Sequence, residues 1–98
     1  MHPDVSFVLP VYNKAAALPY FFASLLAQRG DVSFEVVFVD DVSSDNSLEI
    51  LNGFAAKHDF VRVITNRVNA GPSIRLNQGV KVAKGTYLAL FDCDEVLA

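Results

Sequence analysis

Four short apolar runs, separated by segments with helical spacing, constrain the fold of this chain more than any other feature. The runs span residues 5–11, 34–39, 60–65 and 87–91 and are rich in valine, leucine and phenylalanine. Their apolar residues follow one another rather than alternating with polar ones, which is typical of strands buried on both faces. The pattern therefore predicts four strands of a parallel sheet.

Three helices are predicted between these strands. Apolar residues recur at three-to-four spacing over residues 14–28, where Pro19 is early enough to be tolerated or to shift the helix start. The polar cluster 43–45 offers N-cap side chains for a second helix. The third opens at Gly71 and is expected to end at Gly85 as its C-cap. This alternation, with its short connections, predicts an α/β domain with helices on both faces of the sheet.

Size and charge narrow the class of protein. The chain has 98 residues, of which 52% are hydrophobic and 19% charged, so one compact domain is expected. The formal net charge is -3 and the basic residues are scattered, which argues against a nucleic-acid partner. A membrane span needs roughly 20 consecutive apolar residues, and none is present. We expect a cytoplasmic location, with any membrane association supplied by other parts of a longer parent.

Polar residues gather where the carboxyl ends of the predicted strands should meet. Right-handed crossovers bring those ends to one edge of a parallel sheet, the usual ligand-binding edge of such folds. Asp92 and Asp94 follow the fourth strand and offer hard oxygen ligands to Mg²⁺ or Mn²⁺, although acids after a strand can simply keep a turn solvated. Asp40 and Asp41 follow the second strand, and their mutual repulsion favours a cation or a hydrogen-bond donor between them.

Two further residues at this edge are weaker candidates. Tyr12 could stack on a base or pack as an ordinary half-buried aromatic ring. Arg75, in the first turn of the third helix, could reach a phosphate. The glycine-rich turns of dinucleotide-binding and P-loop proteins are absent. Neither histidine has a neighbouring Ser, Cys or metal-ligand partner in sequence, and Cys93 lacks the spaced Cys or His partners of a structural zinc site.

With these motifs in place, the chain resembles the family 2 glycosyltransferases, whose fold is the GT-A type. Four ordered segments carry the resemblance: residues 5–14, 38–47, 69–87 and 92–94, the last in the place of the family's Asp-x-Asp. The resemblance implies the N-terminal, donor-binding portion of such an enzyme, with a Rossmann-like sheet in strand order 3-2-1-4. It also implies a nucleoside-diphosphate sugar, commonly a UDP-sugar, and a divalent metal, Mn²⁺ or Mg²⁺.

The resemblance also implies roles for individual residues. Asp94 would bind the metal directly, and Asp92 would lie near the ribose and the sugar. Pro10 and Tyr12 would line the base pocket, and Asp40 or Asp41 would contact the base or the ribose. Asn13 and Arg75 complete the expected set of donor-binding residues.

Three departures from the family pattern matter. Val42 stands where the family usually has Gly or Asn, so a positive φ there would be strained. Leu76 occupies the usual position of an arginine, and Arg75 lies one residue earlier, about 100° around the helix. The family continues into an acceptor half that holds the catalytic base, so we expect the base beyond Ala98 and an inactive fragment. An uncovered fourth strand would then favour self-association or domain swapping.

Two other functions compete with an inverting glycosyltransferase. The chain could be a non-catalytic module that binds nucleotides or a partner protein. A phospho-acceptor receiver-like domain also gathers acids at strand ends, but its acidic pair should follow the first strand rather than the second. The acceptor and the donor sugar are not specified by these residues.

Overall fold

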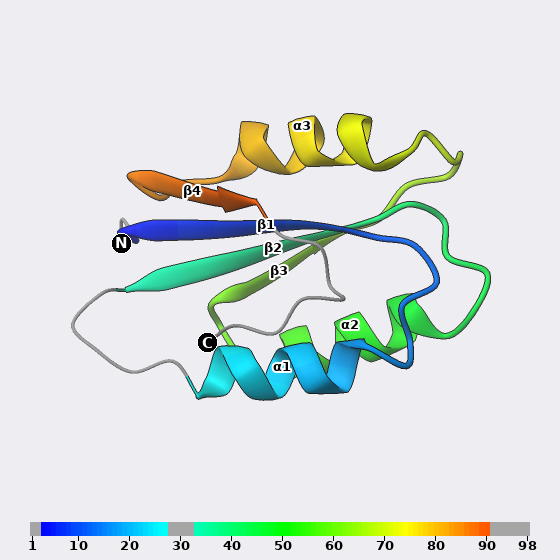
Figure 1. Cartoon of the computed structure of the whole chain (residues 1–98), viewed down its shortest axis with the longest axis horizontal. Helices are drawn as coiled ribbons and strands as arrows, with labels where there is room; N and C mark the ends of the chain where they lie inside the picture. The colour runs from blue at the N-terminus through cyan, green and yellow to red at the C-terminus, as the bar shows by residue number, and fades with distance from the viewer. Residues whose placement is uncertain (1–2, 28–32, 91–98) are drawn as a thin grey trace.

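A single parallel sheet forms the centre of the molecule. The computed structural model describes residues 3–27 and 33–90. In that part the strands are β1 (Val5–Val11), β2 (Phe34–Asp40), β3 (Val61–Ile64) and β4 (Tyr87–Leu90). They pair in parallel in the order β3-β2-β1-β4 (Figure 1). The predicted strand order 3-2-1-4 is thus confirmed.

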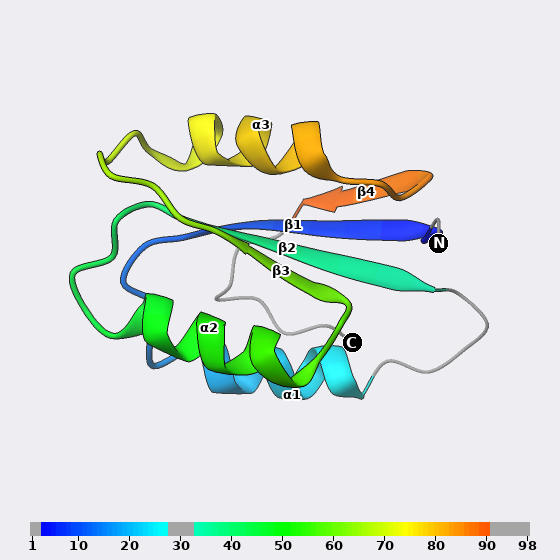
Figure 2. The ribbon, with the colours of Figure 1, turned by 180° about the vertical axis from the view of Figure 1, so that it is seen from behind.

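Three helices cover the two faces of this sheet. Helices α1 (Leu18–Leu26) and α2 (Ser47–Lys57) lie on one face, and α3 (Pro72–Val82) lies on the other. The same separation is visible from both sides of the molecule (Figures 1 and 2). This arrangement confirms the predicted α/β fold with helices on both faces.

The element boundaries differ from the predictions where local backbone contacts decide them. Helix α1 starts at Leu18 instead of residue 14. Residues 15–17 form a tight turn, in which the carbonyl of Lys14 accepts bonds from the amides of Ala17 and Leu18. Pro19 then lies in the first helical turn, where its missing N–H costs nothing.

The prediction of Gly85 as the C-cap of α3 was wrong. The helix ends at Val82, and its cap residue Ala83 is already extended. Gly85 serves a different purpose, because a Cβ there would lie 2.6 Å from the backbone nitrogen of Ser6. The glycine therefore allows the chain to pass close beside β1 before β4 begins.

The larger part of the core lies between the sheet and helices α1 and α2. Phe38 of β2 meets Phe21 and Phe22 of α1 edge-on, and Phe22 stacks on Phe54 of α2 with ring centroids 3.9 Å apart. Rings in these arrangements add to the free energy gained by burying their area. The apolar residues whose spacing predicted these two helices therefore pack against this face of the sheet.

Helix α3 packs very closely on the opposite face. Gly79 is buried against Val8 of β1 and Val39 of β2, and a Cβ at Gly79 would overlap the side chain of Val8. Leu76 packs against the same small cluster of valines. The absence of a side chain at residue 79 thus sets the distance between α3 and the sheet.

A buried polar cluster closes the edge of the sheet where the strands begin. Glu35 accepts hydrogen bonds from Ser6 Oγ and from the amide of Lys84, both at 2.6 Å, and lies 3.7 Å from Arg62 Nη1. Burial raises the pKa of the Glu35 carboxyl, but these donors lower it more, so the net pKa is below its ordinary value. The cluster ties β1 and β2 to the segment before β4.

Strand β4 is the least covered strand of the sheet. Tyr87 is 70% exposed, and Leu88 and Leu90 are each about half exposed. The predicted self-association through this strand stays a prediction. Within residues 3–27 and 33–90, no helix is long and apolar enough to cross a lipid bilayer.

Candidate functional site

A cleft opens at the edge of the sheet where the strands end, as predicted from the topology. Its volume is about 250 Å³. It brings together residues from the end of β1, the end of β2 and the start of α3. Its walls are formed by Pro10, Val11, Tyr12, Lys14, Asp41 and Pro72. Tyr12 is 48% exposed, so much of its ring is accessible to a ligand.

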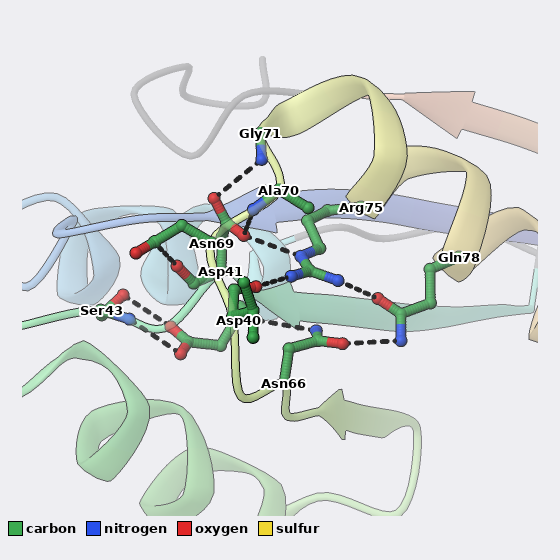
Figure 3. A network of polar contacts seen from close by, with 10 residues as sticks. Asp40, Asp41, Ser43, Asn66, Asn69, Ala70, Gly71, Arg75 and Gln78 are labelled. Atoms are coloured by element: carbon green, nitrogen blue, oxygen red, sulfur yellow. Dashed lines mark hydrogen bonds and ion pairs between the residues drawn. The ribbon is translucent and has the colours of Figure 1, made fainter.

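Among the residues that the structure describes, Asp41 is the acidic residue in this cleft, and protein donors hold its carboxylate (Figure 3). Its Oδ1 accepts bonds from the amide of Ala70 and from Arg75 Nε, both at 2.8 Å, and its Oδ2 accepts one from the amide of Gly71 at 3.1 Å. Gly71 has a φ of 92°, a left-handed conformation that favours glycine. The start of α3 is therefore built around the Asp41 carboxylate.

The ionised form of Asp41 is favoured by this arrangement. Burial raises the pKa of the Asp41 carboxyl, whereas the amide of Ala70, the Arg75 guanidinium and the amide of Gly71 lower it more. The net pKa is below the ordinary aspartate value. An ionised carboxylate is an acceptor only, so a ligand group that forms a hydrogen bond with it has to be the donor.

Arg75 is buried, and its guanidinium contacts protein groups on three sides. Besides Asp41, it donates to the carbonyl of Val68 and to Gln78 Oε1, the latter at 3.3 Å. Gln78 donates in turn to Asn66 Oδ1, and Asn66 donates to the carbonyl of Asp40. These contacts make a closed ring that joins the end of β2, the loop after β3 and the first turns of α3 (Figure 3).

Asp40 is bound within its own turn. Its carboxylate accepts bonds from the amide and the hydroxyl of Ser43, the hydroxyl at 2.6 Å. Between them, Val42 has a φ of 60°, which is rare for a β-branched residue. The strain anticipated at this position is therefore present, and the two predicted acids have different surroundings.

The loops that follow β1 and β2 are joined side by side. Asn13, with a φ of 52°, accepts bonds at Oδ1 from the amides of Ser44 and Asp45 at 2.7 and 3.2 Å. Its Nδ2 donates to Ser44 Oγ at 3.0 Å. Next to it, the amide of Lys14 donates to Ser47 Oγ at 2.8 Å. One wall of the cleft is thus fixed to the loop that follows Asp41.

This fold is shared with proteins of known class. Residues 6–98 match the family model described as Glycosyl transferase family 2. The chain belongs to this family. It is 38% identical to the poly(ribitol-phosphate) beta-glucosyltransferase of Bacillus spizizenii over 95% of its own length and 15% of that protein.

Solved structures of glycosyltransferases have the same fold. The crystal structure of S. aureus TarS residues 1–349 with UDP-GlcNAc matches with a TM-score of 0.86 and 30% identity, over 95% of this chain and 27% of that one. The mannosyltransferase PcManGT from Pyrobaculum calidifontis, solved with GDP-Man and Mn²⁺, matches with a TM-score of 0.85 at 24% identity, which shows the fold alone. This chain therefore spans a minor part of the lengths of the proteins it matches.

The structure brings together some of the family 2 site residues predicted from sequence. Pro10, Tyr12 and Asp41 meet at the cleft, while Asn13, Asp40 and Arg75 contact residues that form or support its walls. Their roles toward a ligand stay predictions. Asp92 and Asp94 lie outside the described residues.

Sequence reasoning missed three residues of the cleft wall, which are Val11, Lys14 and Pro72. Lys14 directly follows Asn13, and its place in the same loop was a usable signal. Pro72 had no such signal, because it reaches the cleft through the packing of α3 on the sheet. In the described ranges, no group of three or more His, Cys, Asp or Glu side chains is placed to hold a metal ion.

Proposed function

We propose that this chain forms the donor-binding part of an inverting glycosyltransferase that uses a nucleoside-diphosphate sugar, with a UDP-sugar as the preferred donor. One observation carries the proposal: the cleft at the carboxyl edge of the sheet brings Pro10, Tyr12 and Asp41 together. The match to TarS, which has been solved with UDP and with UDP-GlcNAc, supports the choice of nucleotide.

The cleft suits the nucleoside end of such a donor. Its volume of about 250 Å³ is below the range of about 300–1,000 Å³ that is typical for a whole drug-sized ligand, so the sugar end extends beyond it. The ring of Tyr12 supplies a face for stacking on the base, and Pro10 adds an apolar wall. Asp41, held ionised, accepts a bond from an N–H or O–H of the nucleoside.

Of the two acids after β2, we assign the ligand contact to Asp41. The Asp40 carboxylate is bonded within the turn to Ser43, whereas Asp41 lies in the cleft wall. Arg75 and the amides of Ala70 and Gly71 then orient Asp41. In this assignment, Arg75 acts on the donor through Asp41 and does not reach a phosphate itself.

Asp92 and Asp94 are the residues we propose to hold a divalent metal. They follow β4, which is paired with β1, so the sequence puts them after the strand adjacent to the one that ends at Val11, directly before Tyr12. Two carboxylates supply the hard oxygen ligands that Mg²⁺ and Mn²⁺ prefer. When bound, such an ion neutralises the diphosphate and stabilises it as a leaving group.

The catalytic base is assigned to a part of the parent protein outside residues 1–98. The residues of this chain bind and orient the donor, and holding a reactant in the right geometry is one of the ways in which an enzyme lowers the barrier of its reaction. The intact parent is the proposed enzyme, and the acceptor hydroxyl is bound by its other parts.

Isothermal titration of UDP with and without Mn²⁺ tests this proposal. We expect Mn²⁺ to strengthen binding of UDP to the chain by about tenfold, which corresponds to about 1.4 kcal/mol. Asp94→Ala should lose this metal-dependent gain. Asp59→Ala, which removes an exposed acid beside β3, should keep it.

Two outcomes contradict different parts of the proposal. Equal, metal-independent affinity in the wild type and in Asp94→Ala eliminates the metal role and favours a non-catalytic nucleotide-binding module. Absence of UDP binding to the wild type, with and without Mn²⁺, eliminates the donor site.

A further inference from the structure

We propose that Asn13 is a positioning residue that holds Tyr12 against the cleft, rather than a residue that contacts the donor. This inference rests on the proposed function, because it assumes that Tyr12 stacks on the nucleoside. It replaces the direct substrate contact expected for Asn13 from sequence.

The backbone at Asn13 decides where Tyr12 lies. Its φ of 52° turns the chain sharply directly after Tyr12, and asparagine tolerates this left-handed conformation better than most residues. Within residues 3–27 and 33–90, the cleft wall includes Tyr12 and Lys14 but not the residue between them. The turn thus presents the neighbours of Asn13 to the cleft.

The side chain of Asn13 is directed to another loop. Its Oδ1 accepts bonds from the amides of Ser44 and Asp45, and its Nδ2 donates to Ser44 Oγ. Both ends of the carboxamide are therefore used by the loop that follows β2. A carboxamide bonded in this way cross-links two segments that are about 30 residues apart in sequence.

Other bonds keep the two loops together when this side chain is removed. The amide of Asn13 donates to Ser43 Oγ, that of Lys14 to Ser47 Oγ, and that of Ala15 to Asp45 Oδ2. None of these bonds uses the Asn13 side chain. Its removal should therefore loosen the turn at Tyr12 without separating the loops.

A double-mutant cycle read by titration of UDP tests this inference. Asn13→Gly keeps the left-handed backbone and removes the carboxamide, so we expect it to weaken UDP binding by about tenfold. In a Tyr12→Ala background the same change should cost less than about twofold, because the ring that Asn13 positions is gone. Asn52→Ala, at an exposed position of α2, is the matched control and should leave affinity unchanged.

Ser44→Ala provides a second variant that removes a partner of Asn13 instead of Asn13 itself. Ser44 is exposed and is not part of the described cleft wall. We expect Ser44→Ala to lower UDP affinity less than Asn13→Gly does, and we expect this loss also to disappear in the Tyr12→Ala background. That result supports the positioning role.

Three results overturn the inference. Unchanged affinity in Asn13→Gly shows that the cross-link is not needed. An equal loss in both backgrounds shows a direct contact between Asn13 and the ligand. If the wild-type chain does not bind UDP, the proposed function fails as well. Titration of the wild-type chain alone identifies this outcome.

Discussion

Arg75 shows how a single position changes the interpretation of the site. Leu76 occupies the position where the family often has arginine, and Arg75 lies about 100° around the helix from it. In the structure Leu76 packs against valines of the sheet, while Arg75 pairs with Asp41 at 2.8 Å. Sequence reasoning anticipated a cation or a donor near the two acids. It did not identify this partner, because the rotation of α3 is set by the close contact at Gly79.

Val42 is the residue where sequence and backbone conflict. Its φ of 60° places a β-branched, half-buried side chain in the left-handed region, which costs about 1–2 kcal/mol. Val42→Asn should relieve part of this strain, because asparagine tolerates the conformation. After subtracting the lost apolar burial, we expect a gain of about 0.5–1 kcal/mol, measured as a rise in Tm of a few degrees.

Val68→Asn is the matched control for this change. It makes the same replacement at an exposed loop position, where we expect an effect within about 0.5 kcal/mol. A Tm of Val42→Asn below that of the wild type would show that the valine methyl groups matter more than the backbone strain.

At the scale of elements, the sequence predicted the strands and helices well because their apolar patterns are used in the core. The predicted strand over residues 5–11 coincides with β1, and the second strand is longer by one residue, Asp40. The third strand is shorter than predicted, Val61–Ile64 instead of residues 60–65, and the N-cap of α2 is Asn46 instead of a residue of the cluster 43–45. Other differences lie where a turn or a close approach competes with periodicity. Lys14 closes a turn before α1, and Gly85 is needed beside β1 instead of at a helix end.

Two helical glycines offer a matched test of how α3 packs on the sheet. Gly79→Ala would place a Cβ against Val8 and 3.1 Å from Cγ2 of Val39, and valine side chains are too stiff to move aside easily. We expect a loss of about 1–3 kcal/mol in the free energy of unfolding, despite the better helix propensity of alanine. Urea denaturation measures it.

Gly53→Ala serves as the control because nothing lies within 4 Å of the added Cβ. There the propensity of alanine alone should act, and we expect a gain of up to about 1 kcal/mol. If both variants become more stable, α3 is not held as closely to the sheet as described.

At the scale of the whole molecule, the two edges of the sheet have different roles. The edge where the strands begin is closed by the cluster around Glu35, whose polar groups bond to one another and to the segment before β4. The opposite edge carries the cleft. The topology predicted which edge would hold the cleft. It could not predict the shape of the cleft, which depends on the cross-linked loops and on the approach of α3.

The chain is a minor part of the proteins it resembles, covering 15% of the Bacillus spizizenii relative. The donor-binding role is therefore the claim that this chain can test by itself. Transfer of a sugar to an acceptor is proposed here for a longer parent protein.

Titration of the ¹⁵N-labelled chain with UDP in the presence of Mn²⁺, followed by NMR, tests that claim most directly. Saturable shifts should be largest for the amides of residues 11–14, 40–45 and 68–71, which form or support the cleft. The amides of Ser6, Glu35 and Lys84, at the opposite edge, should move little. Shifts centred on that opposite edge, or no saturable shifts at all, would contradict the assignment of the donor site.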